Sequence, residues 1–221
     1  MTRSPGPCLL WSVPNGSSAG NMLRSGVLAR VLEDAADARV VLMSPLVADP
    51  SFTREFADSR ITFEPLPAHV PSGVEARLLG IVQAHYLEGR KTETLKIKLG
   101  AGHPGAAMRA RLLKALVGRA ISPRDDWYRW VDRAVSDPAV DAVFARHRPT
   151  AVAVATPGLI FAEIPLLRAA RRRRVPTMAV DLSWDNLTNK LLPIRLVDRL
   201  VVWNTIMNFD NLNAGRVNAI R

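Results

Sequence analysis

The chain has 221 residues and 48% of them are hydrophobic, enough for one large α/β domain with a substantial core. No apolar run approaches the roughly 20 residues of a membrane span. The start of the chain lacks the long apolar region of a secretory signal, so we expect a cytoplasmic protein. Cys8 is the only cysteine, which argues against a disulfide framework and a cysteine-based metal site.

The net charge is +10, from 30 Lys and Arg residues against 20 Asp and Glu residues. Such a surplus favours anionic partners, among them phosphorylated molecules and anionic lipid. The alternative is a compositional bias of the sequence towards arginine and alanine. Only 6% of the residues are aromatic, and they are not interleaved with basic stretches. We therefore expect no nucleic-acid partner.

The N-terminal part of the chain predicts a strand, a turn-rich loop, a helix and a second strand. Turn-forming residues run from Pro14 to Gly20, and apolar residues then recur at helical spacing from Met22 to Leu32. A short β-branched strand follows at 39–43. A unit of this kind places its two strands parallel to each other.

Apolar strands alternate with helices along most of the chain, a pattern typical of a parallel sheet covered on both faces. Six runs predict strands: 8–13, 39–43, 61–67, 150–155, 176–180 and 200–203. The fold class that we predict is therefore α/β, with a Rossmann-like open parallel sheet of about six strands.

The stretch from about 71 to 147 is helical in pattern, and we interpret it as an insertion between the third and fourth strands. A later helix, from Ile160 to Arg171, contains Pro165, which is expected to bend it. Taken together, the pattern predicts one domain over residues 1–207. Residues 208–221 are predicted to be a weakly ordered or truncated tail.

The first candidate binding segment follows the first predicted strand and opens the first helix. Glycines let a backbone approach a ligand closely, and the free N–H groups of a helix N-terminus attract anions. The spacing of the glycines differs from that of the dinucleotide fingerprint and of a Walker loop. The alternative is a tight turn in which Ser or Asn caps the helix. The candidate substrate-binding residues here are Gly16, Ser17, Ser18, Gly20 and Asn21.

The second candidate segment runs from Asp181 to Lys190, directly after the predicted strand 176–180. In open α/β sheets, ligands bind at the carboxyl ends of the strands. The segment is dense in hydrogen-bonding side chains, and its tryptophan is suited to stacking on a sugar. The alternative is that these residues serve as ordinary turn and cap residues. The candidates are Asp185 for catalysis and Trp184, Asn186, Thr188 and Lys190 for substrate binding.

The third candidate segment is the turn after strand 150–155. Thr156 and Gly158 lie in this turn and are candidate substrate contacts. Glu163 follows one to two helical turns later and is a candidate general base. The alternative is that Glu163 is an ordinary solvated residue of the helix.

Other polar residues favour structural roles. Arg168 and the run 171–174 occupy the end of a helix, where the macrodipole favours cations, and we expect a solvated helix end. The four histidines show no metal-ligand spacing, so no metal is expected. His69 follows the third strand and is expected near the same sheet edge. The basic stretch 91–98 predicts either contact with an anionic membrane surface or a solvated face.

These segments together resemble a known family. The first strand with its glycine-containing loop, the turn at 156–158 and the Arg-rich helix that leads into Val175-Pro176 resemble the N-terminal domains of GT-B glycosyltransferases. Residues 183–190 are similar to a "WDNxT-K" loop of bacterial surface-polysaccharide transferases and CDP-glycerol glycerophosphotransferase-like proteins. The resemblance covers most of the chain and is firmest over residues 150–204.

The resemblance implies the acceptor-side half of a two-domain enzyme, in which a C-terminal domain binds most of the nucleotide-activated donor. The implied ligand is a sugar or a lipid-linked acceptor in surface polysaccharide or glycolipid synthesis. No cofactor is implied. Asp185 or Glu163 would deprotonate the acceptor hydroxyl, while the loop 16–21 and Lys190 would position the acceptor. A peripheral contact with the inner face of the membrane is also expected, from the basic stretch 91–98.

In one respect the chain departs from many inverting members of this family. The segment from Asn15 to Arg24 contains no His, Asp or Glu that would serve as a base. Two other readings therefore stay open. One is a non-catalytic truncated fragment, or a binding subunit of a split transferase whose partner chain supplies the C-terminal domain. The other is half of a nucleotide-sugar epimerase.

Overall fold

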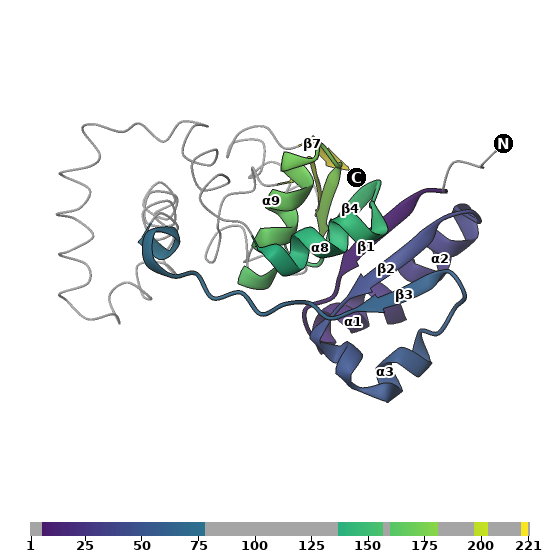
Figure 1. Ribbon diagram of the computed structural model, residues 1–221. Coiled ribbons are helices and arrows are strands. Elements are labelled where there is room, and N and C mark those ends of the chain that lie inside the picture. Colours follow the sequence, from purple (N-terminus) through teal and green to yellow (C-terminus); the bar gives the residue numbers. More distant parts are fainter. Residues whose placement is uncertain (1–5, 78–136, 157–159, 181–196, 203–217, 221) are drawn as a thin grey trace, which may run out of the picture.

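The computed structural model describes residues 6–77, 137–156, 160–180, 197–202 and 218–220. Within them lies one open sheet in which every strand pairs in parallel with its neighbours (Figure 1). The strand order is β3-β2-β1-β4-β5-β6-β7. The predicted α/β fold with a Rossmann-like parallel sheet is thereby confirmed.

The seven strands follow the predicted apolar runs closely, with one addition. Their bounds are β1 (Cys8–Ser12), β2 (Arg39–Met43), β3 (Ile61–Glu64), β4 (Ala151–Val154), β5 (Thr177–Val180), β6 (Arg199–Val201) and β7 (Asn218–Ile220). β7 lies in the segment 208–221, for which the sequence predicts no element. Three residues are too few to show the alternation of apolar and polar side chains by which a strand is recognised.

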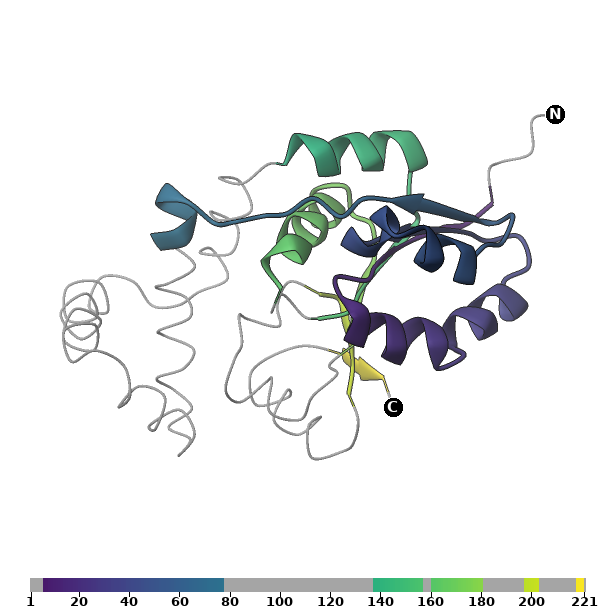
Figure 2. The same cartoon turned by 90° about the horizontal axis from the view of Figure 1, so that it is seen from below.

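Helices cover both faces of the sheet, and Figure 2 shows the two layers on opposite sides of the strands. One face carries α1 (Gly16–Ala19), the π-helical turn η1 (Gly20–Arg24), α2 (Val27–Asp34), the 3-10 turn η2 (Pro45–Ala48) and α3 (Pro50–Glu55). The other face carries α8 (Pro138–His147), the 3-10 turn η3 (Phe161–Glu163) and α9 (Ile164–Arg172). No helix in these described segments is long and apolar enough to cross a membrane.

Each face has its own hydrophobic core, because side chains alternate along every strand. In β1, Cys8 and Leu10 pack with the face that carries α8 and α9. Trp11 and, just beyond the strand, Val13 pack with the face that carries α1 and α2. The central strands are therefore buried on both sides, which explains why they are apolar almost throughout.

The first helix differs from its prediction in both its start and its continuity. It begins at Gly16 rather than near Met22, and it is divided before Val27. The division falls at Gly26, whose φ of 89° lies in the left-handed region that a helix cannot use. Periodicity alone does not reveal this break, because the apolar residues on both sides of it face the same core.

Pro165 also has a different role from the one predicted. It lies in the first turn of α9, where its missing N–H removes no helical hydrogen bond, so it begins the helix instead of bending it. The three residues before α9 form the 3-10 turn η3. This arrangement places Glu163 at the junction between η3 and α9.

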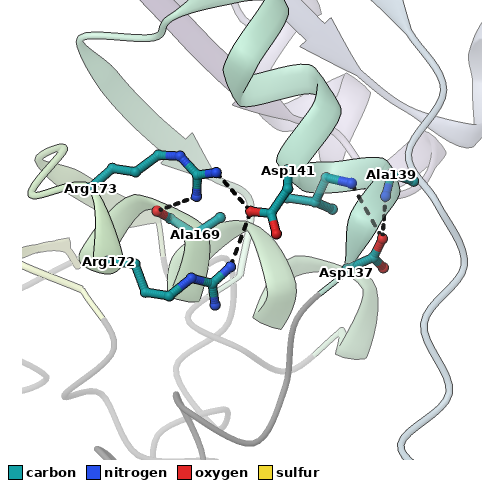
Figure 3. A network of polar contacts seen from close by, with 7 residues as sticks. Asp137, Ala139, Asp141, Ala169, Arg172 and Arg173 are labelled. Atoms are coloured by element: carbon teal, nitrogen blue, oxygen red, sulfur yellow. Dashed lines mark hydrogen bonds and ion pairs between the residues drawn. The ribbon is translucent and has the colours of Figure 1, made fainter.

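Ion pairs attach α8 and α9 to each other. Asp141 of α8 accepts contacts from Arg172, the last residue of α9, and from Arg173, which caps that helix, at 3.1 and 2.9 Å (Figure 3). Asp137 caps the start of α8 by accepting the N–H groups of Ala139 and Val140. These exposed contacts fit the solvated helix end that the sequence predicts.

Arg168 does not fit that prediction. Its side chain is 1% exposed, and its Nη1 donates to Oε1 of Glu75 at 2.9 Å. His69 Nε2 lies 2.9 Å from the same oxygen. The expectation of a solvated basic end is therefore wrong for Arg168, because its side chain is buried against Glu75 of the segment that follows β3. Figure 2 shows this segment running past the helices α8 and α9.

Candidate functional site

The direction in which the chain adds strands reverses between β1 and β4. From β1 the chain proceeds to β2 and β3 on one side, and from β4 it proceeds to β5 and β6 on the other. In open parallel sheets, ligands bind outside the carboxyl ends of the strands at such a reversal. We call the described residues beyond these two ends, 13–21 and 155–163 without 157–159, the switch-point edge.

The part of the switch-point edge that follows β1 is a short, capped and largely exposed loop. Val13 N donates to Met43 O at 2.8 Å, which holds the start of the loop against β2. The side chain of Asn15 then accepts the N–H of Ser18 at 2.9 Å and so caps α1. Asn15, Gly16 and Ser17 are exposed. Capping, which the sequence left open as an alternative to ligand binding, is thus present.

Of the candidates in this loop, Gly16, Ser17 and Asn21 are exposed, Gly20 is half-buried and Ser18 is buried. A Cβ atom added to Gly16 or Gly20 would meet no other atom within 4 Å. Gly20 also has ordinary helical backbone angles. Neither packing nor backbone conformation thus demands a glycine at Gly20, and its lack of a side chain leaves backbone open to approach. Substrate contact by these residues stays a prediction.

Glu163 is the central polar group in the part of the edge that follows β4. Its side chain is 0% exposed, so the interpretation as an ordinary solvated residue is wrong. Its Oε1 accepts the N–H of Ala155 at 2.9 Å, and its Oε2 accepts the N–H of Thr156 at 3.0 Å. The hydroxyl of Thr156 donates to Oε2 as well. The carboxylate therefore closes the turn that leaves β4.

Burial raises the pKa of the Glu163 carboxyl to about 7, because an apolar environment disfavours the charged form. The donors from Thr156 and Ala155 and the nearby hydroxyl of Ser12 oppose this rise without cancelling it. No charged side chain of the described residues contributes to the shift. The carboxyl group is thus poised to change its charge near neutral pH.

Ser12, the last residue of β1, is a part of the site that the sequence analysis did not identify. It is fully buried, and its hydroxyl lowers the pKa of Glu163 although it lies outside hydrogen-bonding geometry with any described residue. A signal was present in the sequence, since a serine that ends an apolar strand before a turn is a polar group at a strand end. Its proximity to Glu163 could not be predicted, because the two residues are far apart in the sequence and come together only when β1 pairs with β4.

The hydroxyl of Thr156 makes hydrogen bonds within the protein. It accepts the N–H of Ile160 at 3.2 Å while donating to Glu163, so it joins both ends of the turn. Thr156 is also largely buried. A ligand that contacts this hydroxyl would therefore compete with its hydrogen bonds to Glu163 and Ile160. Substrate binding by Thr156 stays a prediction.

The remaining predicted residues, apart from His69, cannot be placed relative to this edge because they are not among the described residues. Gly158, Trp184, Asp185, Asn186, Thr188 and Lys190 lie outside the described residues, as does the basic stretch 91–98. His69 pairs with Glu75 instead. In the segments that the structure describes, no group of three His, Cys, Asp or Glu residues is arranged to hold a metal ion.

Comparison with known proteins identifies no family. No family model matches the chain, and no curated protein matches it. Similar solved structures include MurG of Acinetobacter baumannii, at 11% identity and a TM-score of 0.41 over 97% of this chain and 44% of MurG. UGT2 of Phytolacca americana, solved with UDP-2-fluoro-glucose and pterostilbene, matches at 10% identity and a TM-score of 0.41, over 91% of this chain and 48% of UGT2.

Both of these structures are GT-B glycosyltransferases. The chain spans less than half the length of either one. A similarity of this degree carries no argument about activity.

Gly20, the first residue of η1, and Gly26, which precedes α2, provide a test of the loop geometry. Gly20→Ala is expected to raise the free energy of unfolding by about 0.5–1 kcal/mol, because Gly20 is helical and has free space around it. Gly26→Ala is expected to lower it by about 1 kcal/mol, because φ at Gly26 is 89°. Urea denaturation of both variants measures this. A loss of stability in Gly20→Ala equal to that in Gly26→Ala would contradict the described backbone.

The raised pKa of Glu163 makes stability depend on pH. The folded state holds a proton on this carboxyl up to about pH 7, whereas the unfolded chain releases it near the ordinary value of 4.5. The free energy of unfolding is therefore expected to fall as the pH rises through this window and to level off above it. Glu163→Gln should remove this fall, and denaturant titrations at a series of pH values measure it. An unchanged slope in Glu163→Gln would rule out this carboxyl as the source.

Proposed function

We propose that the chain is the acceptor-binding half of a GT-B-type glycosyltransferase and that the acceptor is held at the switch-point edge. One observation carries this proposal: the chain leaves β1, β4 and β5 at the carboxyl edge of the sheet, beside the reversal of strand order. The exposed polar loop around Ser17 follows β1, and the segment 181–190, which resembles a transferase loop, follows β5 directly. Both would face the same ligand.

The chemistry that we propose is displacement at the anomeric carbon of a nucleotide-activated donor. The acceptor hydroxyl forms the new bond to carbon while the bond from that carbon to the diphosphate breaks, and a carboxylate takes the hydroxyl proton. Positive groups stabilise the leaving diphosphate. The donor would be held by a C-terminal domain or by a partner chain, and Lys190 would help to position the acceptor.

Of the two candidate bases, we assign proton abstraction to Asp185. Glu163 is the only carboxylate in the segments 13–21 and 155–163, and its side chain is buried under three donors. A base must reach the proton that it removes. Glu163 would have to lose bonds to Ala155 or Thr156 to do so. We therefore propose as the base Asp185, the other candidate that the family resemblance implies.

The acceptor class that we propose is a sugar or a lipid-linked sugar of surface polysaccharide or glycolipid synthesis. The similarity of residues 183–190 to the loop of such transferases supports this class. The net charge of +10 and the basic stretch 91–98 support a peripheral contact with an anionic membrane. That contact would bring the chain to a lipid-linked acceptor.

A second candidate is a binding subunit without catalytic residues of its own. The sequestration of Glu163 favours it, because the segments beyond β1 and β4 then hold a ligand and supply no base. The two candidates differ in whether Asp185 matters for turnover.

Binding can be measured on the 221-residue chain by calorimetry and by amide chemical shifts. We expect octyl β-glucoside, as an acceptor probe below its micellar concentration, to shift the amides of Asn15, Gly16 and Ser17. UDP-glucose and CDP-glycerol, as donor probes, are expected not to bind. Ser17→Trp should weaken acceptor binding by about tenfold or more, because the ring fills the exposed loop.

Ser51→Trp is the matched control, because Ser51 is equally exposed but lies in α3 beyond β2. Its affinity for the glucoside should equal that of the unaltered chain. Micromolar binding of either nucleotide donor to this chain would contradict the assignment of the donor to another domain.

Turnover separates the two candidate functions. In an assembly that contains the donor-binding domain, Asp185→Asn is expected to lower kcat by about 10²- to 10⁴-fold, the usual contribution of a general base. The KM for acceptor should change little. An unaltered rate would remove Asp185 from catalysis and favour the binding subunit.

A further inference from the structure

We infer that Glu163 is a positioning residue that joins the carboxyl ends of β1 and β4 and thereby sets the position of the loop from Asn15 to Ser17. The inference about the strand ends stands on the structure alone. Its consequence for ligand binding rests on the proposed function, in which this loop meets the acceptor.

The first step is the attachment of Glu163 to the end of β4. Both of its carboxylate oxygens accept backbone N–H groups, from Ala155 at 2.9 Å and from Thr156 at 3.0 Å. Through the hydroxyl of Thr156 it is also linked to Ile160 N. Without this carboxylate, two buried N–H groups would lack an acceptor, which is costly in a dry environment. One side chain thus holds Ala155 and Thr156, the two described residues that directly follow β4.

The second step is the contact with the end of β1. Trp11 is paired with Ala153, so Ser12 lies one residue further out, beside Val154. Alternation along the strand places Ser12 on the same face as Leu10, which is the face that carries α9. Its buried hydroxyl has no hydrogen-bond partner among the described residues and is close enough to favour the charged form of Glu163.

A serine hydroxyl suits both protonation states of its neighbour. It donates to a carboxylate, and it accepts from the O–H of a protonated carboxyl. When Oε1 carries a proton, this oxygen still accepts the N–H of Ala155. Its O–H can then donate to the hydroxyl of Ser12. Loss of the proton reverses the direction of that contact and places a charge in the core. The end of β1 therefore responds to the charge of Glu163.

Other groups do not supply this response. From β1, β4, η3 and α9, the described groups that meet the carboxyl are those of Ser12, Ala155 and Thr156, and no charged side chain is among them. Arg168, the next charged residue along α9, is directed to Glu75. Asn15 lies only three residues beyond Ser12, so a displacement at the end of β1 reaches the loop directly.

The opposite end of the same strand pair offers a matched comparison. There, the hydroxyl of Thr150 accepts the N–H of Cys8 at 2.9 Å and lies 3.2 Å from Cys8 O. This contact also ties β1 to β4 through a side chain, but Thr150 carries no charge and does not titrate. Thr150→Val therefore weakens the pairing of the two strands without touching the switch-point edge.

The decisive experiment follows backbone amide signals of the full chain by NMR between about pH 5 and pH 9. We expect Ala155, Thr156 and the residues from Asn15 to Ser17 to share one inflection. Glu163→Gln should abolish it at all of these positions, and Thr150→Val should retain it. A folded chain in which Asn15 to Ser17 show no inflection, or Glu163→Gln in which the inflection persists, would overturn the inference.

Ser12→Ala tests the link itself, and it retains the carboxylate in case Glu163→Gln fails to fold. The inflection should then remain at Ala155 and Thr156 but disappear from Asn15 to Ser17. If it remains in the loop, Ser12 does not connect the two strand ends and the inference is wrong.

The consequence for ligands is measured with octyl β-glucoside at several pH values. In the unaltered chain the dissociation constant should follow the same inflection, and Glu163→Gln should raise it by about tenfold and flatten its pH profile. Thr150→Val should leave it unchanged. Absence of binding to the unaltered chain, with the amide coupling intact, would refute the proposed function and not the positioning role of Glu163.

Discussion

The pairing of β1 with β4 is the constraint on which the rest of the structure depends. It joins segments that are 142 residues apart at Cys8 and Thr150, and it lies where the strand order reverses. Closing so long a loop carries an entropic cost, which burial of apolar side chains on both faces of the pair has to offset. The two hydrophobic cores accordingly meet across these strands, with Leu10 and Val152 in one and Trp11 and Ala153 in the other.

The same pairing explains why polar groups gather at one end of an apolar sheet. Strands buried on both faces admit few polar side chains along their length, so such groups collect where the strands stop. At the amino end a neutral hydroxyl, that of Thr150, meets backbone atoms. At the carboxyl end the buried carboxyl group of Glu163 accepts from two backbone N–H groups and from the hydroxyl of Thr156. Of these two groups, only the carboxyl of Glu163 can change its charge near neutral pH.

Much of the sheet was predictable, because strands such as β2 are short, β-branched and apolar on both faces and so stand out in the sequence. The division at Gly26 was not, since the left-handed backbone there leaves the apolar spacing intact. The burial of Glu163 was not either. Its spacing from the turn placed it near the sheet edge, but whether it faces solvent depends on the 3-10 turn η3. Asp185 and Trp184 lie outside the described residues, so that part of the predicted site stays a prediction.

The two faces of the sheet differ in how far apart in the chain their residues lie. Most of the core around Trp11 comes from residues 11–63, with short connections between successive elements. The core around Leu10 needs β4, α8 and α9, which arrive much later in the chain. Contacts between near neighbours form faster than distant ones. We therefore expect a time order during folding, in which β1, β2 and β3 assemble with α1 to α3 first. The switch-point edge would then come into existence only when β4 docks against β1.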